Sequence, residues 1–96
     1  MFAIGDRRWP GLSKLVEECG EVIQVVGKLM ATHGEESHFS GLNLAAMFVL
    51  ETADVAAAVE FVVGFFDRAQ RELFTLRKQE KLRLFQKWHR EQAGHE

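Results

Sequence analysis

Apolar residues recur at helical spacing along three long segments of the chain, and no segment shows sustained alternation of apolar and polar positions. In the first segment they stand three or four residues apart, which is the spacing of one helical face. These positions are Leu12, Leu15, Val16, Cys19, Val22, Ile23, Val26, Leu29 and Met30. Trp9-Pro10 precedes the run, as is typical of a helix start, because the N–H that proline lacks would be unpaired there anyway. The run ends around Thr32-His33-Gly34, and Gly34 is expected to cap the helix.

Two further helices are expected after a loop at residues 34–41, which has room for one short helical turn. The second helix begins near residues 40–43, ends at about Phe66 and is apolar nearly all round. The third helix extends from about Asp67 to His89 and is highly charged. This pattern predicts an all-α fold, a bundle of three long helices in a single domain that spans residues 1–96.

The second helix is long enough to cross a bilayer, since the segment from Leu42 to Phe66 holds 25 residues. It also holds three acidic residues, and each costs roughly 2.5–3.5 kcal/mol at the centre of a bilayer, which outweighs several Leu or Val residues. A helix that is apolar on all sides is equally suited to the centre of a bundle. We therefore expect a bundle helix and no membrane partner.

The composition favours self-association. A chain of 96 residues buries only about 60–65% of the surface that it exposes when unfolded, so a lone monomer would be marginally stable. Hydrophobic residues nevertheless make up 47% of this chain, with eight Phe and two Trp. We expect a homodimer or a dimer of dimers that pairs the apolar second helices. The single Cys19 and the absence of a long apolar stretch at the N-terminus favour a reducing, cytoplasmic setting.

Acidic and basic residues are segregated along the chain. Residues 1–66 carry four basic and nine acidic side chains, whereas residues 67–92 carry eight basic and four acidic ones. Such a division is typical either of two oppositely charged solvated surfaces or of acids that hold a metal beside bases that contact phosphate. Nucleic-acid binding through the basic third helix is the least favoured function, because the net charge is −2 and acids interrupt the basic residues.

Acidic residues interrupt both apolar helices at helical spacing. The first helix contains E-E-x-x-E at Glu17, Glu18 and Glu21, and the second contains E-x-x-D at Glu51 and Asp54. Residues three apart share one side of a helix, so each motif presents a pair of carboxylates together. Either motif alone is common on exposed helices. Their occurrence together on two apolar helices is what indicates a functional site.

A helical wheel places these acids relative to the apolar surfaces. The apolar stripe of the first helix centres near Cys19 and Val26, with Glu18 at its edge and Lys14 on the side of Glu18. On the second helix the acidic pair interrupts an apolar surface. Glu60 points nearly the opposite way, and we interpret it as a solvent or interface charge.

A divalent cation would remove two costs of clustered carboxylates, which repel one another and whose pKa values rise on burial. Mg²⁺ prefers hard oxygen ligands and completes its shell with water and phosphates. Paired inward-facing acids also build di-iron sites in helical bundles, but those require Glu-x-x-His, which neither acid pair here provides. The expected cofactor is therefore Mg²⁺, with Mn²⁺ as a substitute. The four His residues and Cys19 lack zinc-ligand spacing.

The two motifs together resemble those of the MazG-type all-α nucleoside triphosphate pyrophosphohydrolases. The matching segments are Leu-Val-Glu-Glu-Cys-Gly-Glu-Val at 15–22 and Leu-Glu-Thr-Ala-Asp-Val at 50–55, and the resemblance extends over residues 9–88. Gly20 and Val22, which flank the last Glu of the first motif, also match. The chain departs from the family pattern at Ala58, where relatives often carry an aromatic or polar residue, and its last helix lacks K-x-x-x-N.

The resemblance implies Mg²⁺-dependent hydrolysis of a nucleoside or deoxynucleoside triphosphate to the monophosphate and pyrophosphate, as in housecleaning of the nucleotide pool. It implies that Glu18, Glu21, Glu51 and Asp54 are the metal ligands. Glu17 would bind the metal through water or orient the attacking water, so Glu17 and Glu18 are the expected catalytic residues.

Four further residues are candidates for substrate contacts. Lys28 lies two turns after Glu21 on the same side, Lys78 and Lys81 lie on the basic third helix, and Trp9 offers a ring for stacking on a base. Each has an ordinary alternative interpretation, as a solvated lysine or a core aromatic. For the whole chain, the alternative function is a non-catalytic helical module that oligomerises or senses nucleotides.

Overall fold

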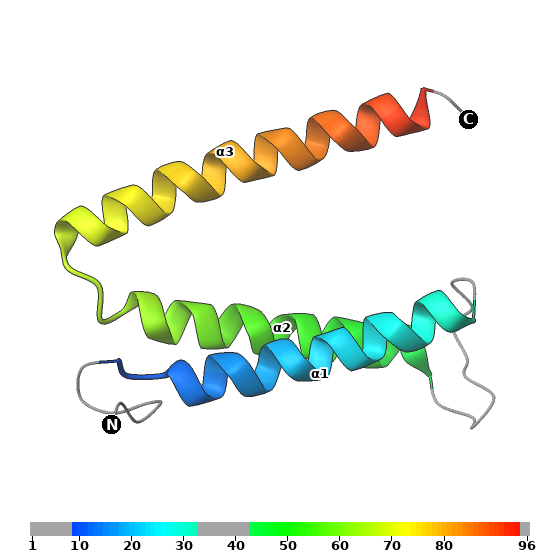
Figure 1. Ribbon diagram of the computed structural model, residues 1–96, viewed down its shortest axis with the longest axis horizontal. Coiled ribbons are helices and arrows are strands. Elements are labelled where there is room, and N and C mark those ends of the chain that lie inside the picture. Colours follow the sequence, from blue (N-terminus) through cyan, green and yellow to red (C-terminus); the bar gives the residue numbers. More distant parts are fainter. Residues whose placement is uncertain (1–8, 33–42, 95–96) are drawn as a thin grey trace. The chain divides into compact units, whose positions relative to one another are not determined.

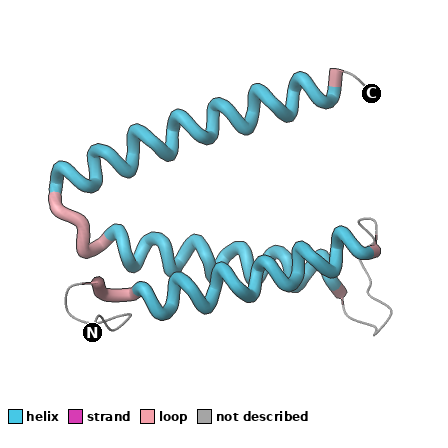
Figure 2. The backbone as a smooth tube through the Cα atoms, viewed as in Figure 1, coloured by secondary structure: helices cyan, strands magenta, loops and turns pink. Residues whose placement is uncertain are grey.

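The computed structural model describes residues 9–32 and 43–94, and these form three helices and no β-strand. The helices are α1 (Leu12–Ala31), α2 (Leu44–Val63) and α3 (Arg68–Ala93), and a short loop at residues 64–67 connects α2 to α3 (Figures 1 and 2). The predicted all-helical chain with three helices is confirmed. The expected short turn at 34–41 and the expected cap at Gly34 lie outside the described residues.

The first two helices begin at residues that suit their positions. Gly11 precedes α1 with a φ of 84°, a left-handed conformation that favours glycine because it has no Cβ. Asn43 precedes α2 in an extended conformation, and its side-chain Oδ1 accepts a hydrogen bond of 3.0 Å from the backbone N–H of Ala46. This bond satisfies one of the N–H groups that a helix leaves unpaired at its start.

The boundary between α2 and α3 differs from the predicted one, because α2 ends at Val63 and not at about Phe66. Asp67 explains the difference, because it caps α3 in an extended conformation. Its side chain accepts a hydrogen bond from the backbone N–H of Gln70, and the side chain of Gln70 accepts one from the backbone N–H of Asp67. A capping residue must leave helical geometry, so α2 has to end before it. The third helix also continues beyond the predicted His89 to Ala93.

The chain divides into two compact units, Met1–Phe65 and Phe66–Glu96. In the first unit α1 and α2 lie side by side and form a helical hairpin (Figure 1). Its buried side chains among the described residues are Val25 of α1 and Leu44 and Ala58 of α2, of which Leu44 is fully buried. A three-helix bundle within one domain stays a prediction.

The side of α1 that faces α2 is not the side predicted as the centre of its apolar stripe. Val25 is buried, whereas Val26, at the predicted centre, is 36% exposed. The apolar surface of α1 is wider than one helix can cover, so α2 packs against one half of it and the other half stays open. Val16, Ile23 and Met30, which follow one another at intervals of seven, are 61–73% exposed.

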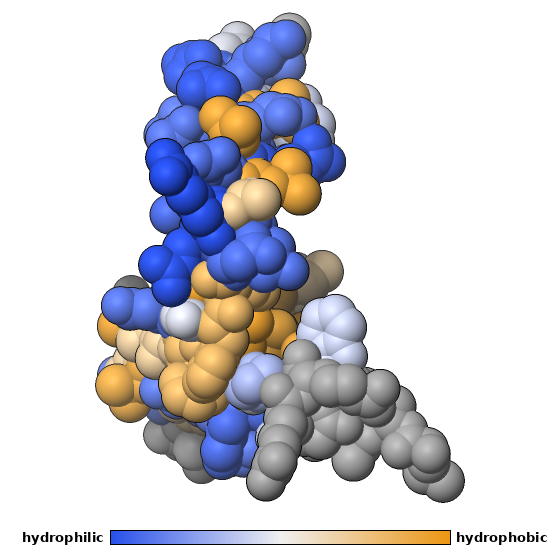
Figure 3. Space-filling view, turned by 90° about the vertical axis from the view of Figure 1, so that its left-hand side faces the viewer, coloured by the Kyte–Doolittle hydropathy of each residue, from blue (hydrophilic) through white to orange (hydrophobic). Residues whose placement is uncertain are grey.

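Hydrophobic side chains reach the surface of both units (Figure 3). On α2, Val49 and Leu50 are about two thirds exposed. On α3 the large exposed apolar residues are Leu73, Leu76, Leu82, Phe85 and Trp88. Among the described helices, none combines the length and the hydropathy that a membrane span requires.

In the described part of the second unit, Phe66 and Asp67 precede α3 and Gly94 follows it. Exposed ion pairs one turn apart line this helix, with N···O distances of 3.4 Å for Arg68–Glu72 and 2.7 Å for Arg77–Glu80. Such pairs stabilise a solvated helix by a few tenths of a kcal/mol each. The ring of Phe66 packs edge-on against Phe74 at a centroid separation of 6.2 Å.

Replacing Gly11 by Ala is expected to destabilise the hairpin by about 1–3 kcal/mol. The alanine would be held at a strained φ, and its Cβ would lie 2.8 Å from Cδ2 of Phe61. Gly27→Ala is the matched control, because nothing lies within 4 Å of its Cβ position inside α1, and there alanine should stabilise by about 0.5–1 kcal/mol. Urea unfolding followed by circular dichroism measures both. Equal stability of Gly11→Ala and wild type would contradict the close approach.

Candidate metal centre

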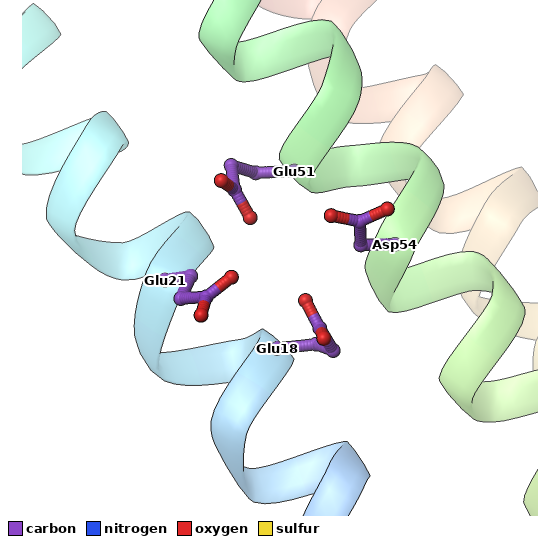
Figure 4. A group of neighbouring side chains, drawn as sticks. All are labelled: Glu18, Glu21, Glu51 and Asp54. Atoms are coloured by element: carbon purple, nitrogen blue, oxygen red, sulfur yellow. The ribbon is translucent and has the colours of Figure 1, made fainter.

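Four carboxylates from the two predicted motifs meet between α1 and α2. Glu18 and Glu21 project from α1, Glu51 and Asp54 project from α2, and the side chains point toward one another (Figure 4). One oxygen of each residue lies within 4.8 Å of one oxygen of every other. Spacing of three places each pair on one side of its helix, and the packing of α1 on α2 sets the two pairs face to face. We call these four residues the carboxylate cluster.

The cluster is partly buried, and no cationic side chain belongs to it. Glu18, Glu21 and Glu51 are half-buried and Asp54 is exposed. Oε2 of Glu18 and Oε2 of Glu51 are buried atoms with no hydrogen-bond partner. A buried polar atom without a partner normally destabilises a fold, so such atoms in a native protein require an explanation.

The pKa values of two members respond to this environment. Partial burial, followed by the negative charges of Glu21 and Asp54, raises the pKa of Glu18 above its ordinary value. Hydrogen bonding to Glu21, followed by burial and the surrounding negative charges, raises the pKa of Glu51. Both shifts reflect a site that disfavours its own negative charge in the absence of a counter-ion.

Lys14 is the cation beside the cluster, but it does not neutralise it. Its ammonium lies 3.2 Å from Oε2 of Glu17, which stands outside the cluster. The contact with Glu17 is the main cause that raises the pKa of Lys14, and the negative charges of Glu18 and Glu21 contribute less. Glu17 is therefore an exposed, ion-paired residue at the edge of the site.

The donor set suits a hard divalent cation. Among the described residues it consists of carboxylate oxygens alone, which are the ligands that Mg²⁺ and Mn²⁺ prefer, with no imidazole or thiolate. The two unpaired buried oxygens are of the kind that a bound cation satisfies. Glu60 is exposed and does not belong to the cluster, in agreement with its interpretation from the sequence.

The predicted substrate-binding residues are placed as follows. Lys28 lies in the last turn of α1 and is half-buried, and Trp9 stands just before α1 and is 53% exposed. Lys78 and Lys81 lie on α3, in the second unit, where the ammonium of Lys78 is 5.4 Å from the centroid of the Phe74 ring. The roles assigned to these four residues stay predictions.

A cleft that sequence reasoning missed opens beside the cluster. Its volume is about 330 Å³, and it is lined by Lys14, Glu18, Asp54, Ala57, Ala58 and Phe61. The helical wheel predicts Lys14 on the side of Glu18, but the two acidic motifs do not point to Lys14 or Phe61 as site residues. The available signal was spacing, because Phe61 follows Asp54 by seven residues and so lies two turns further along a similar side of α2.

Comparison with known proteins identified no relative: no family model, no curated protein and no solved structure matches the chain. The family resemblance therefore depends on the two motifs and on the residues that flank them.

Glu51→Gln is expected to stabilise the metal-free protein at neutral pH. Because the pKa values of Glu18 and Glu51 are raised in the fold, these groups favour folding below their ordinary value of 4.5. That contribution is lost as the pH rises through the raised values. A neutral Gln removes one such group, so the free energy of unfolding should fall less steeply with rising pH. Urea unfolding with a chelator between about pH 4 and pH 8 measures the two slopes; identical slopes would argue against the shift.

Proposed function

We propose that this protein is a Mg²⁺-dependent nucleoside triphosphate pyrophosphohydrolase, which converts its substrate to the monophosphate and pyrophosphate. One observation carries the proposal: the four acids that the motif resemblance selects as metal ligands are the four whose oxygens lie within 4.8 Å of one another. The two motifs stand about thirty residues apart in the sequence, and an incidental pair of acidic motifs would have no reason to converge.

In this proposal Glu18, Glu21, Glu51 and Asp54 hold the cation, with Mn²⁺ as a substitute for Mg²⁺. The ion supplies charge neutralisation at the phosphates and a water that is easier to ionise. Glu17 lies one residue before Glu18 and is exposed, where it would bind the cation through water or orient the attacking water. Phosphoryl transfer depends mainly on positioning and electrostatics, which a fixed set of charged side chains provides.

The proposed activity places the protein in the nucleotide-pool housecleaning of the cytoplasm, with a small nucleotide as its partner. The alternative function is a module that binds nucleotides or oligomerises without turnover. It shares the carboxylate cluster with the enzyme, so the two functions differ in product formation and not in the architecture of the site.

Glu51→Gln and Asp54→Asn are each expected to lower pyrophosphate release at least a hundredfold while helicity is retained. Each substitution keeps the shape of the side chain and removes one negative ligand. The measurement is release of pyrophosphate from a panel of ribo- and deoxyribonucleoside triphosphates with Mg²⁺ or Mn²⁺. Glu60→Gln is the matched control, because it removes an exposed carboxylate of the same helix outside the cluster. Unchanged turnover in both cluster variants would refute the assignment.

We also propose that a second copy of the chain covers the apolar side of the hairpin, giving a dimer or a dimer of dimers. Lys14 of α1 and Asp54 and Phe61 of α2 line the same cleft. The sides of the two helices that carry these residues therefore form one face of the hairpin. At 100° per residue, the opposite sides of both helices share the other face. The large residues there are Val16, Ile23, Val26, Met30, Phe48 and Val49, all at least 36% exposed.

The area of this apolar face supports an interface. At roughly 100 Å² for each large side chain, the six expose on the order of 600 Å² before the smaller residues between them are counted. That is the upper end for the largest apolar patch of a monomer, and it approaches the roughly 800 Å² that each partner contributes to a standard interface. Because the cleft opens on the other face, pairing here would leave the carboxylate cluster accessible.

Ile23→Lys is expected to shift the protein toward the monomer, because a charge would be buried in the interface without a partner. Sedimentation velocity over a range of concentrations measures the shift. The control is Gln24→Lys, which adds the same charge one residue further along, on an exposed polar position of α1. A wild type that stays monomeric at high concentration would rule out this association.

A further inference from the structure

The cleft beside the carboxylate cluster combines three kinds of chemistry within one unit of the structure. Glu18 and Asp54 form its acidic wall, Lys14 supplies a cation, and Phe61 supplies an aromatic ring. Every lining residue comes from α1 or α2. Its volume of about 330 Å³ lies at the lower end for small-molecule sites, which are typically concave and mainly apolar with a few polar groups.

The ring of Phe61 is held in place although the residue is 54% exposed. On one side it approaches the backbone of Gly11 so closely that a Cβ there would lie 2.8 Å from Cδ2 of the ring. On another side it packs edge-on against Phe65, with centroids 5.2 Å apart and an interplanar angle of 78°. A ring with two fixed neighbours loses little further freedom when a ligand stacks on it, which favours binding.

The space in front of this ring exists because the neighbouring residues are small. Ala57 and Ala58 line the cleft between Asp54 and Phe61, and a larger side chain at either position would occupy the volume. Phe61 follows Ala58 by three residues on the same helix, so the ring stands at the end of this small-residue stretch.

We propose that Phe61 is the stacking surface for the base of the nucleotide and that Lys14 contacts its phosphates, an inference that rests on the proposed function. The seven residues from Asp54 to Phe61 correspond to about 10 Å along the helix axis, which a sugar and its phosphates can bridge. The metal held by the acids, together with Lys14, would bind the phosphates at one end of the cleft. The ring of Phe61 would bind the base at the other end.

This arrangement also indicates how selective the site is. A phenylalanine ring offers a π-face and no hydrogen-bond donor or acceptor, and every base can stack on such a face. The Phe61 contact therefore favours nucleotides over ligands that lack a ring, and it does not distinguish one base from another. The ligand class is a broad set of nucleoside triphosphates.

The test compares two ligands that differ in the ring. A nucleoside triphosphate that the wild type binds and inorganic tripolyphosphate are each titrated calorimetrically into the Mg²⁺-loaded protein. Phe61→Ala is expected to weaken nucleotide binding about tenfold or more and to leave tripolyphosphate binding within about twofold of wild type, whereas Phe61→Tyr should keep both. Lys14→Met should weaken both ligands. Phe85→Ala, at an exposed phenylalanine of α3 that neither lines the cleft nor belongs to the proposed interface, should change neither.

A second variant tests the same subsite with Phe61 in place. Ala57→Phe fills the cleft from an exposed position, so it should also weaken the nucleotide selectively, and circular dichroism reports whether either variant is folded. Nucleotide binding unchanged by both Phe61→Ala and Ala57→Phe, or weakening of both ligands by the same factor, would overturn the ring subsite while the proposed function stands. If neither the nucleoside triphosphates nor tripolyphosphate bind to the wild type, the proposed function and the subsite are both overturned.

Discussion

The packing of α1 on α2 is the contact on which the rest of this structure depends, and its centre contains four carboxylates. Val25, Leu44 and Ala58 are the buried apolar residues of the hairpin, and the cluster lies on the same contact surface. Apolar burial draws the two helices together, while the like charges of Glu18 and Glu51 push them apart. A cation between the helices would reverse the sign of that second contribution, so one site would support both the fold and the chemistry.

The hairpin has two unlike faces because its helices are apolar over more of their circumference than they can cover for each other. One face holds the open side of the cluster and the cleft with Phe61. The other holds the line of Val16, Ile23 and Met30, which the hairpin leaves exposed. In the proposed assembly the second copy would cover one face and the ligand would occupy the other, so neither would block the other.

The sequence predicted the three helices and the composition of the cluster, because both depend on local spacing. Acids three residues apart must share a side of a helix, so Glu18 with Glu21 and Glu51 with Asp54 were recoverable from the motifs alone. Contact between the two pairs depends on which side of each helix packs inward. The wheel placed the centre of the α1 stripe near Val26, but α2 covers the side of Val25, because an apolar surface this broad does not specify its partner side.

Other features depended on tertiary placement and were not accessible from local patterns. The approach of Gly11 to Phe61 joins residues fifty positions apart, and the cleft is lined by residues of both α1 and α2. The early end of α2 follows from the capping role of Asp67. The sequence contains this signal, but the apolar run continues to Phe66 and favours a longer helix. Lys78 and Lys81 belong to a separate unit, so their part in any ligand site depends on the assembled protein.

The central claim is that the carboxylate cluster binds a divalent cation, and the most direct measurement is calorimetric titration of Mg²⁺ into the metal-free protein. Titrations in two buffers of different ionisation enthalpy, at a pH near the raised pKa values of Glu18 and Glu51, also count the protons that binding releases. The account predicts a saturable site that releases protons, with less release at higher pH. Absence of saturable binding, or binding without proton release at any pH, would contradict it.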